Sequence, residues 1–369
     1  MRTGDRSEYD YTISPEQYLK LDYKTLIDRC KTPNGALGDI CSKRYFWEQK
    51  TFYDFGNLYD LYDVEGNGWN AYQYYRNLFT LDLIDSLDER EPLIAEKLLE
   101  INEKKQFLIV NGQNSRGETA LIQASFKGHE DIVEILLDIG ANPNIRDDLG
   151  NTALTYASME GYAGIVEMLV DADADSNNKN DKGDTALMYA SLKNRVYTVK
   201  LLLDKDADPN VKNDNGDTAL MYASLKNYGG IVKILLENNT NPNIQNEEGK
   251  TALMYASRLG YDDIVRLLLD KGADPNLKNE NGDTALIFAS FKGYDDVVQT
   301  LLDNGADQNI QNKEGKTALM YASGRSHIYV VEKLWADLET NLDLEDEEGK
   351  TALMYAFEAG DDAIVRMLR

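Results

Sequence analysis

The tripeptide Gly-Lys-Thr occurs three times, at Gly249, Gly315 and Gly349, and it matches the end of a phosphate-binding loop. In such a loop a second glycine, five residues earlier, lets the backbone amides cradle the phosphates. The tripeptide does not predict a nucleotide site, because the earlier position is occupied by Ile244, Ile310 and Leu344.

An acidic stretch between Asp60 and Gly68 has the composition of a calcium-binding loop. That loop has a glycine at its sixth position and oxygen ligands at its first and twelfth positions. With Gly66 at the sixth position, the first ligand would be Leu61 and the last Tyr72. The spacing therefore excludes this type of calcium site.

The chain has two histidines, His129 and His327, and two cysteines, Cys30 and Cys41. These are too few for a zinc cluster, and nothing in their spacing predicts a histidine-based catalytic triad. Carboxylates are abundant, but no pair is singled out for glycoside chemistry. We therefore expect a protein that is not an enzyme and that needs no metal or cofactor.

Most of the chain consists of a repeated sequence segment, and this repeat must position any functional residue within it. The segment Gly-x-Thr-Ala-Leu-x-x-Ala recurs at intervals of 33 residues, except for the last interval, which is 34. A fixed period of this size predicts a solenoid of stacked units rather than one globule around a single core. Its glycines are Gly117, Gly150, Gly183, Gly216, Gly249, Gly282, Gly315 and Gly349.

One period predicts a turn followed by two helices. The polar run 246–249 ends in glycine and predicts a tight turn. Thr251 can cap the first helix, and Gly260 can end it in left-handed geometry. A second helix is expected from about Asp262 to Gly272, with its apolar residues on one stripe.

The period GKTALMYASRLGYDDIVRLLLDKGADPNLKN resembles the ankyrin repeat almost residue by residue. The resemblance covers residues 114–369 and implies an all-α solenoid that binds proteins. The family's usual histidine in the first helix is methionine here, as in Met188 and Met221. Glycine at the end of the second helix is replaced in three repeats by residues that tolerate left-handed geometry, namely Asp173, Asp206 and Asn239.

Three parts follow from this pattern. Residues 114–369 should form eight ankyrin repeats, the last of them truncated. Residues 81–113 have helical apolar spacing without the repeat signature, which predicts a degenerate N-terminal capping repeat. Residues 1–80 are rich in aromatic residues and predict a small helical module.

The N-terminal module resembles an F-box-like motif through Ser14-Pro15-Glu16, Leu26, Cys30 and Phe46-Trp47. Similar modules accompany ankyrin repeats in proteins of large DNA viruses. The resemblance implies that Pro15, Glu16 and Trp47 contact a ubiquitin-ligase adaptor while the repeats hold the substrate. The alternative is a helical cap whose aromatic residues only fill a core.

The composition gives a formal net charge of −25. Nucleic acids and anionic membranes are disfavoured as partners, because both need clustered lysine and arginine. Long-range steering favours a basic protein partner, although the charge can also serve solubility alone. The two cysteines, and an N-terminus without the apolar core of a secretory signal, predict a cytoplasmic protein.

The predicted partner-binding residues lie on the first helix of each repeat. One aromatic position recurs, and the residues three and four further on share its side of the helix. Together these residues should line a concave groove, and the turn tips should give it an acidic edge. The alternative is that the tyrosines only fill the space between repeats. The predicted binding residues are Phe126, Tyr156, Met159, Tyr189, Leu192, Lys193, Tyr222, Leu225, Lys226, Tyr255, Arg258, Phe288 and Phe291.

Overall fold

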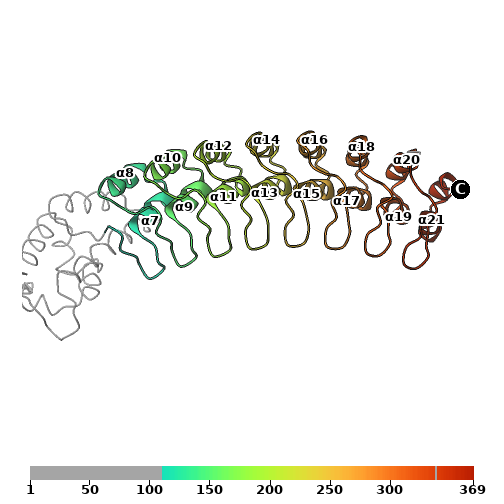
Figure 1. Ribbon diagram of the computed structural model, residues 1–369, viewed down its shortest axis with the longest axis horizontal. Helices are drawn as coiled ribbons and strands as arrows, with labels where there is room; N and C mark the ends of the chain where they lie inside the picture. The colour runs from blue at the N-terminus through green and yellow to red at the C-terminus, as the bar shows by residue number, and fades with distance from the viewer. Residues whose placement is uncertain (1–109, 337–338) are drawn as a thin grey trace, which may run out of the picture. The chain divides into compact units, whose positions relative to one another are not determined.

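The computed structural model describes residues 110–336 and 339–369, which form eight helical hairpins in series and contain no strand (Figure 1). The first helices of the hairpins are α7 (Ala120–Lys127), α9 (Ala153–Glu160), α11 (Ala186–Leu192), α13 (Ala219–Leu225), α15 (Ala252–Leu259), α17 (Ala285–Lys292), α19 (Ala318–Gly324) and α21 (Ala352–Ala359). The second helices are α8 (Glu130–Asp138), α10 (Ala163–Asp171), α12 (Val196–Asp204), α14 (Gly229–Glu237), α16 (Asp262–Asp270), α18 (Asp295–Asp303), α20 (Ile328–Ala336) and α22 (Asp362–Met367).

The prediction of an all-helical solenoid is thereby confirmed for this part of the chain. The predicted module at 1–80, with Pro15, Glu16 and Trp47, lies outside the described residues. So does nearly all of the predicted capping repeat at 81–113.

Each first helix begins at a threonine. Thr251 has extended backbone angles, and its hydroxyl accepts a hydrogen bond from the amide of Met254 at 3.3 Å. The same cap begins the other first helices, for example at Thr185 and Thr218. A side chain thus satisfies one of the amides that a helix start leaves without an intrahelical partner.

Most of the second helices end in left-handed backbone, which glycine, aspartate and asparagine supply. Gly272 and Gly305 end two of the second helices with φ of 83° and 80°. The substitutes predicted from the sequence adopt the same geometry, because short polar side chains tolerate it best. Their φ angles are 62° for Asp173, 63° for Asp206 and 55° for Asn239.

Equivalent positions are buried in successive repeats and form the core. In the third repeat Leu187 and Ala190 on α11 and Leu202 on α12 are 0–1% exposed. The first helices pack against one another more extensively than the second helices do. Alanine and serine at the contacts, such as Ala190 and Ser191, let the helix backbones approach closely. This difference curves the stack toward its first helices.

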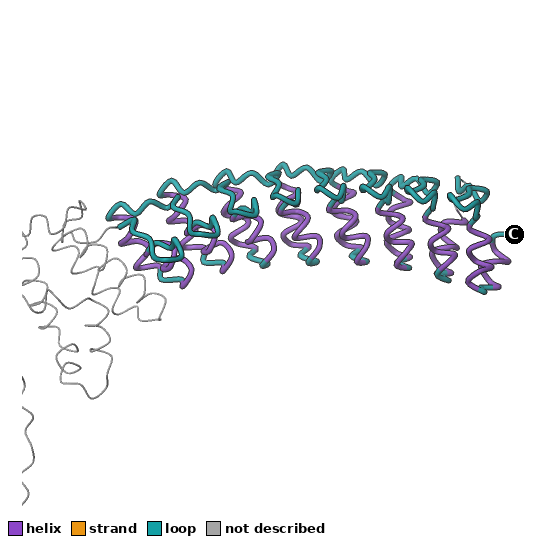
Figure 2. The backbone as a smooth tube through the Cα atoms, turned by 90° about the horizontal axis from the view of Figure 1, so that it is seen from below, coloured by secondary structure: helices purple, strands orange, loops and turns teal. Residues whose placement is uncertain are grey.

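The two edges of this solenoid are formed by different kinds of connection. The long turns between hairpins project along one edge, and the short connections within hairpins lie along the opposite edge (Figure 2). Neighbouring long turns are joined by backbone hydrogen bonds, such as that from the Asp214 amide to the Lys182 carbonyl at 3.0 Å. The face between these edges is lined by the first helices.

Candidate functional site

Four of the predicted binding residues form a row of half-buried tyrosines, which we call the tyrosine row: Tyr156, Tyr189, Tyr222 and Tyr255. Their hydroxyl groups bind the turns of their own repeats. The side-chain amide of Asn180 donates to the hydroxyl of Tyr189 at 3.0 Å, and Asn213 donates to Tyr222 at 2.9 Å. Tyr255 receives the same hydrogen bond from Asn246 at 3.1 Å. These tyrosines therefore fix the first helix to its turn and present only part of the ring to solvent.

The asparagines that bind Tyr222 and Tyr255 also join neighbouring turns. The Asn213 amide donates to Asp184 of the preceding repeat at 2.7 Å, while its oxygen accepts from the amides of Asn215 and Asp217. Asn246 donates to Asp217 in the same way at 2.8 Å. This chain of side chains links adjacent turns in repeats such as the third, fourth and fifth, which have methionine in place of the expected histidine.

The row has an altered electrostatic environment. Burial raises the pKa of Tyr156 to about 12, and a hydrogen bond from its hydroxyl to Asp147 at 2.6 Å adds to the shift. Burial and the carboxylates of Asp184 and Asp217 also raise the pKa of Tyr222. Both effects disfavour tyrosinate, so these hydroxyls remain neutral donors and acceptors near neutral pH.

Phe288 lacks a hydroxyl and interrupts the row. Asn279 beneath it is 3.5 Å from Asp283 of its own repeat. Phe288 instead lines an open hollow of about 270 Å³ together with Lys250 and Arg258. The structure therefore brings together two of the predicted binding residues, Arg258 and Phe288, on the first-helix face.

The ends of the first helices form a second row, which we call the exit row. Leu192 and Leu225 are half-exposed, and Lys193 and Lys226 beside them are exposed. The other members are half-exposed and lie on α7, α9, α15 and α17. They are Phe126, Met159, Arg258 and Phe291.

The two phenylalanines of the exit row are engaged within the solenoid. The ring of Phe291 meets Tyr321 edge-on at 5.5 Å, and the Arg325 guanidinium lies over it at 3.6 Å. Phe126 meets Tyr156 in the same way at 5.3 Å. The two leucines, Leu192 and Leu225, are half-exposed like the phenylalanines.

Comparison with known proteins identifies the repeat. A family model described as ankyrin repeats (3 copies) matches overlapping stretches that together cover 89–369. The chain belongs to the ankyrin repeat family. The first matched stretch, 89–180, begins within the segment predicted as a degenerate ankyrin repeat.

Solved ankyrin structures support this assignment. The crystal structure of the ankyrin repeat domain of Bcl-3, described as a unique member of the IkappaB protein family, matches with a TM-score of 0.55 at 29% identity. The match covers 60% of this chain and 99% of that domain. A search of curated proteins gives no significant match. Ankyrin repeats are scaffolds for protein–protein interaction, so a protein partner follows from the family.

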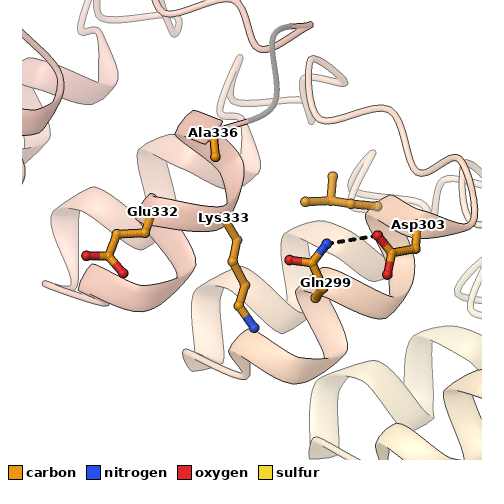
Figure 3. Close-up of a pocket in the computed structure, with 6 residues that line it drawn as sticks. Gln299, Asp303, Glu332, Lys333 and Ala336 are labelled. Carbon is orange, nitrogen blue, oxygen red and sulfur yellow. Dashed lines mark hydrogen bonds between the residues drawn. The ribbon is translucent and has the colours of Figure 1, made fainter.

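A second hollow lies on the other side of the ankyrin solenoid, between α18 and α20 (Figure 3). It has a volume of about 350 Å³ and is lined by Gln299, Asp303 and Lys333, among others. Gln299 donates to Asp303 at 2.8 Å, and Lys333 forms an ion pair with Asp295 at 3.0 Å. Gln299, Asp303 and Lys333 are thus already engaged with one another or with a neighbouring helix.

Sequence reasoning missed a set of exposed aromatic residues on the second helices. Tyr197 on α12 is 72% exposed and Tyr329 on α20 is 68% exposed. The equivalent position elsewhere is aspartate or a small residue, as in Asp263 and Gly230. That comparison across repeats was the signal that could have revealed them.

The described ankyrin repeats bring together few groups that could do chemistry. Across 110–336 and 339–369, no group of three or more histidine, cysteine or acidic side chains is placed to hold a metal ion. Within the same ranges no helix has the length and apolar character needed to traverse a bilayer. The candidate site is therefore a surface, made of the exit row and the first-helix face.

Proposed function

We propose that this ankyrin protein is a non-enzymatic scaffold that holds a protein partner on its first-helix face. The observation that carries the proposal is the pair of half-exposed leucines, Leu192 and Leu225, between fully buried neighbours such as Ser191 and Ser224. Binding energy at protein interfaces concentrates in a few side chains on a rigid support. The tyrosine–asparagine links supply that rigidity, because they fix each first helix to its turn.

The proposal is tested by removing the two leucines together. Proteins that co-purify with the full-length chain are identified by mass spectrometry, and their affinity is then measured with purified components. Leu192→Ser with Leu225→Ser should weaken binding about tenfold or more, since each loses an apolar contact worth about 1 kcal/mol.

The matched control is Tyr329→Ser, which removes an exposed aromatic side chain from the second-helix side. This control should bind as the unaltered protein does, and circular dichroism should show equal helicity for all three proteins. Equal affinity of the double-leucine variant and the control would contradict the proposal.

A more specific role is that of a substrate receptor for a ubiquitin ligase. The N-terminal pattern Ser14-Pro15-Glu16 to Phe46-Trp47 supports it, with Pro15, Glu16 and Trp47 as adaptor contacts. Such a receptor would act in the cytoplasm. In this case the full-length chain co-purifies with a ligase adaptor, and Trp47→Ala abolishes that association while leaving the ankyrin partner bound. Retention of the adaptor by the Trp47→Ala chain would exclude this contact.

A further inference from the structure

The connections within hairpins differ in charge from repeat to repeat. In the third and fourth repeats they carry Lys193 and Lys226, both exposed and neither in an ion pair with a carboxylate of the described residues. In the fifth and sixth repeats the following second helices begin with aspartate pairs. These pairs are Asp262-Asp263 and Asp295-Asp296.

Apolar surface accumulates at the same two connections. Leu192 and Leu225 are half-exposed at the ends of α11 and α13. Val196 and Tyr197, at the start of α12, are 43% and 72% exposed. We call the six residues concerned the exit patch: Leu192, Lys193, Val196, Tyr197, Leu225 and Lys226.

Small residues flank the tyrosine of the exit patch. The position of Tyr197 is occupied by Gly164 in the second repeat and Gly230 in the fourth. A side chain placed on Gly229 or Gly230 would meet no other atom within 4 Å. The surface beside Tyr197 is therefore open on the side of the fourth repeat.

We infer that the exit patch binds an acidic protein segment that also carries apolar side chains. This inference rests on the proposed function and specifies the chemistry of the partner. The ammonium groups of Lys193 and Lys226 face the carboxylates of the segment. Its apolar side chains cover Leu192, Leu225 and Tyr197.

The charges close to the exit patch determine whether it binds an acidic or a basic segment. The net charge of −25 favours basic molecules at long range. Charges beyond roughly 8–10 Å are largely screened at physiological ionic strength, so the lysines at the contact count most once the partner is docked. Acidic residues such as Asp181 and Asp214 belong to the long turns. These turns lie along the opposite edge of the solenoid (Figure 2).

The exit patch has defined limits. On the side of the second repeat, Arg195 forms an ion pair with Glu160 at 3.8 Å and donates to the Met159 carbonyl at 3.0 Å. That arginine is engaged within the solenoid. On the side of the fifth repeat, Asp262 forms an ion pair with Arg266 at 2.8 Å, and the exposed Asp263 beside it repels an acidic segment. The surface that the acidic segment contacts is thus confined to the third and fourth repeats.

A protein segment fits this surface better than a nucleic acid does. The exposed leucine, valine and tyrosine side chains need apolar partners to be removed from water. A sugar–phosphate backbone offers none, and two lysines neutralise few phosphates. The surrounding aspartates oppose a polyanion more strongly than a short segment with spaced carboxylates.

The inference is tested with full-length protein and two labelled synthetic peptides, one alternating leucine with glutamate and the other leucine with lysine. Fluorescence anisotropy should show tighter binding of the leucine–glutamate peptide. Lys193→Glu with Lys226→Glu should weaken this binding about tenfold, because two surface pairs change from attraction to repulsion. Lys292→Glu, an equivalent exposed lysine beside Asp295 and Asp296, is the matched control and should have little effect.

Three outcomes would overturn the inference: tighter binding of the leucine–lysine peptide, equal effects of the two sets of lysine variants, or no binding of the leucine–glutamate peptide. Tighter binding of duplex DNA, lost on Lys193→Glu with Lys226→Glu, would assign the patch to nucleic acid instead. The co-purified partner separates the two proposals. If Leu192→Ser with Leu225→Ser weakens its binding and the lysine variants do not, only the acidic-segment inference fails.

Discussion

At the scale of single residues, the half-buried tyrosine hydroxyls make the free energy of unfolding depend on pH in the alkaline range. Burial raises the pKa of Tyr156 from the ordinary 10.0 to about 12 in the folded state. Between these values the unfolded chain loses the proton while the folded chain keeps it. Unfolding is therefore increasingly favoured as pH rises from 10 to 12, and the contribution is fully present below pH 10.

Tyr156→Phe isolates this contribution. Phenylalanine does not titrate, so the stability difference between the unaltered protein and the variant should shrink as pH rises from 10 to 12. Urea unfolding followed by circular dichroism at several pH values measures the difference, and absorbance at 295 nm reports tyrosinate directly. A difference that stays constant over this range would contradict the assigned shift.

Asn213 should be among the more sensitive single residues of the long turns. It is 7% exposed and connects Asp184 of the preceding repeat, Tyr222 and two backbone amides. Asn213→Ala leaves buried partners unsatisfied and should cost about 1–3 kcal/mol in the free energy of unfolding. The control is Asn215→Ala, an exposed side chain of the same turn, which should change stability by less than about 0.5 kcal/mol. Equal losses would show that the asparagine link carries no special stability.

At the scale of helices, residues marking element ends were predictable from the sequence. The expected helix from about Asp262 to Gly272 is α16, Asp262–Asp270, and Gly272 after it is left-handed as predicted. The predicted cap at Thr251 and the left-handed Gly260 bound the preceding helix, α15. These features depend on residues within one period. Their physical cause is local backbone geometry and capping, which repeat whenever the sequence does.

Contacts between periods were not predictable in the same way. The Asn213–Asp184 bond joins residues 29 positions apart, and Arg325 covers a phenylalanine of the preceding repeat. The sequence placed Phe291 in an exposed row, but it could not show that a neighbouring arginine stacks on its ring. Partner binding by the tyrosine and exit rows therefore stays a prediction, with the half-exposed Leu192 and Leu225 as the residues that test it.

The ends of the second helices offer a test at this scale. Asp206 has a φ of 63°, where Gly272 and Gly305 occupy the equivalent position in later repeats. Asp206→Gly relieves left-handed strain and should stabilise the protein by about 1 kcal/mol. The reverse change, Gly272→Asp, should destabilise it by a similar amount. Urea midpoints measure both, and a loss of stability in Asp206→Gly would show that the aspartate contributes more than its backbone strain costs.

At the scale of the whole molecule, the solenoid has no single core, so stability is a sum over repeats and their interfaces. A repeat with a neighbour on each side buries both faces of its first helix. Met320 in the seventh repeat is 2% exposed, while Met354 at the same position of the eighth is 47% exposed. The eighth repeat therefore gains less from burial than any repeat between the second and the seventh.

This difference predicts the order in which the repeats open. Amides of α21 and α22 should exchange with deuterium earlier than those of α13 and α14, because α21 buries fewer side chains than α13 and local opening costs least where burial is smallest. Hydrogen exchange followed by mass spectrometry measures the order directly. Met354→Ser provides the internal check: since its side chain is half-exposed, it should cost far less stability than Met221→Ser, whose side chain is 2% exposed. Equal protection of the two helix pairs, with equal cost of the two substitutions, would mean that the solenoid unfolds as one cooperative unit and that its stability is not additive over repeats.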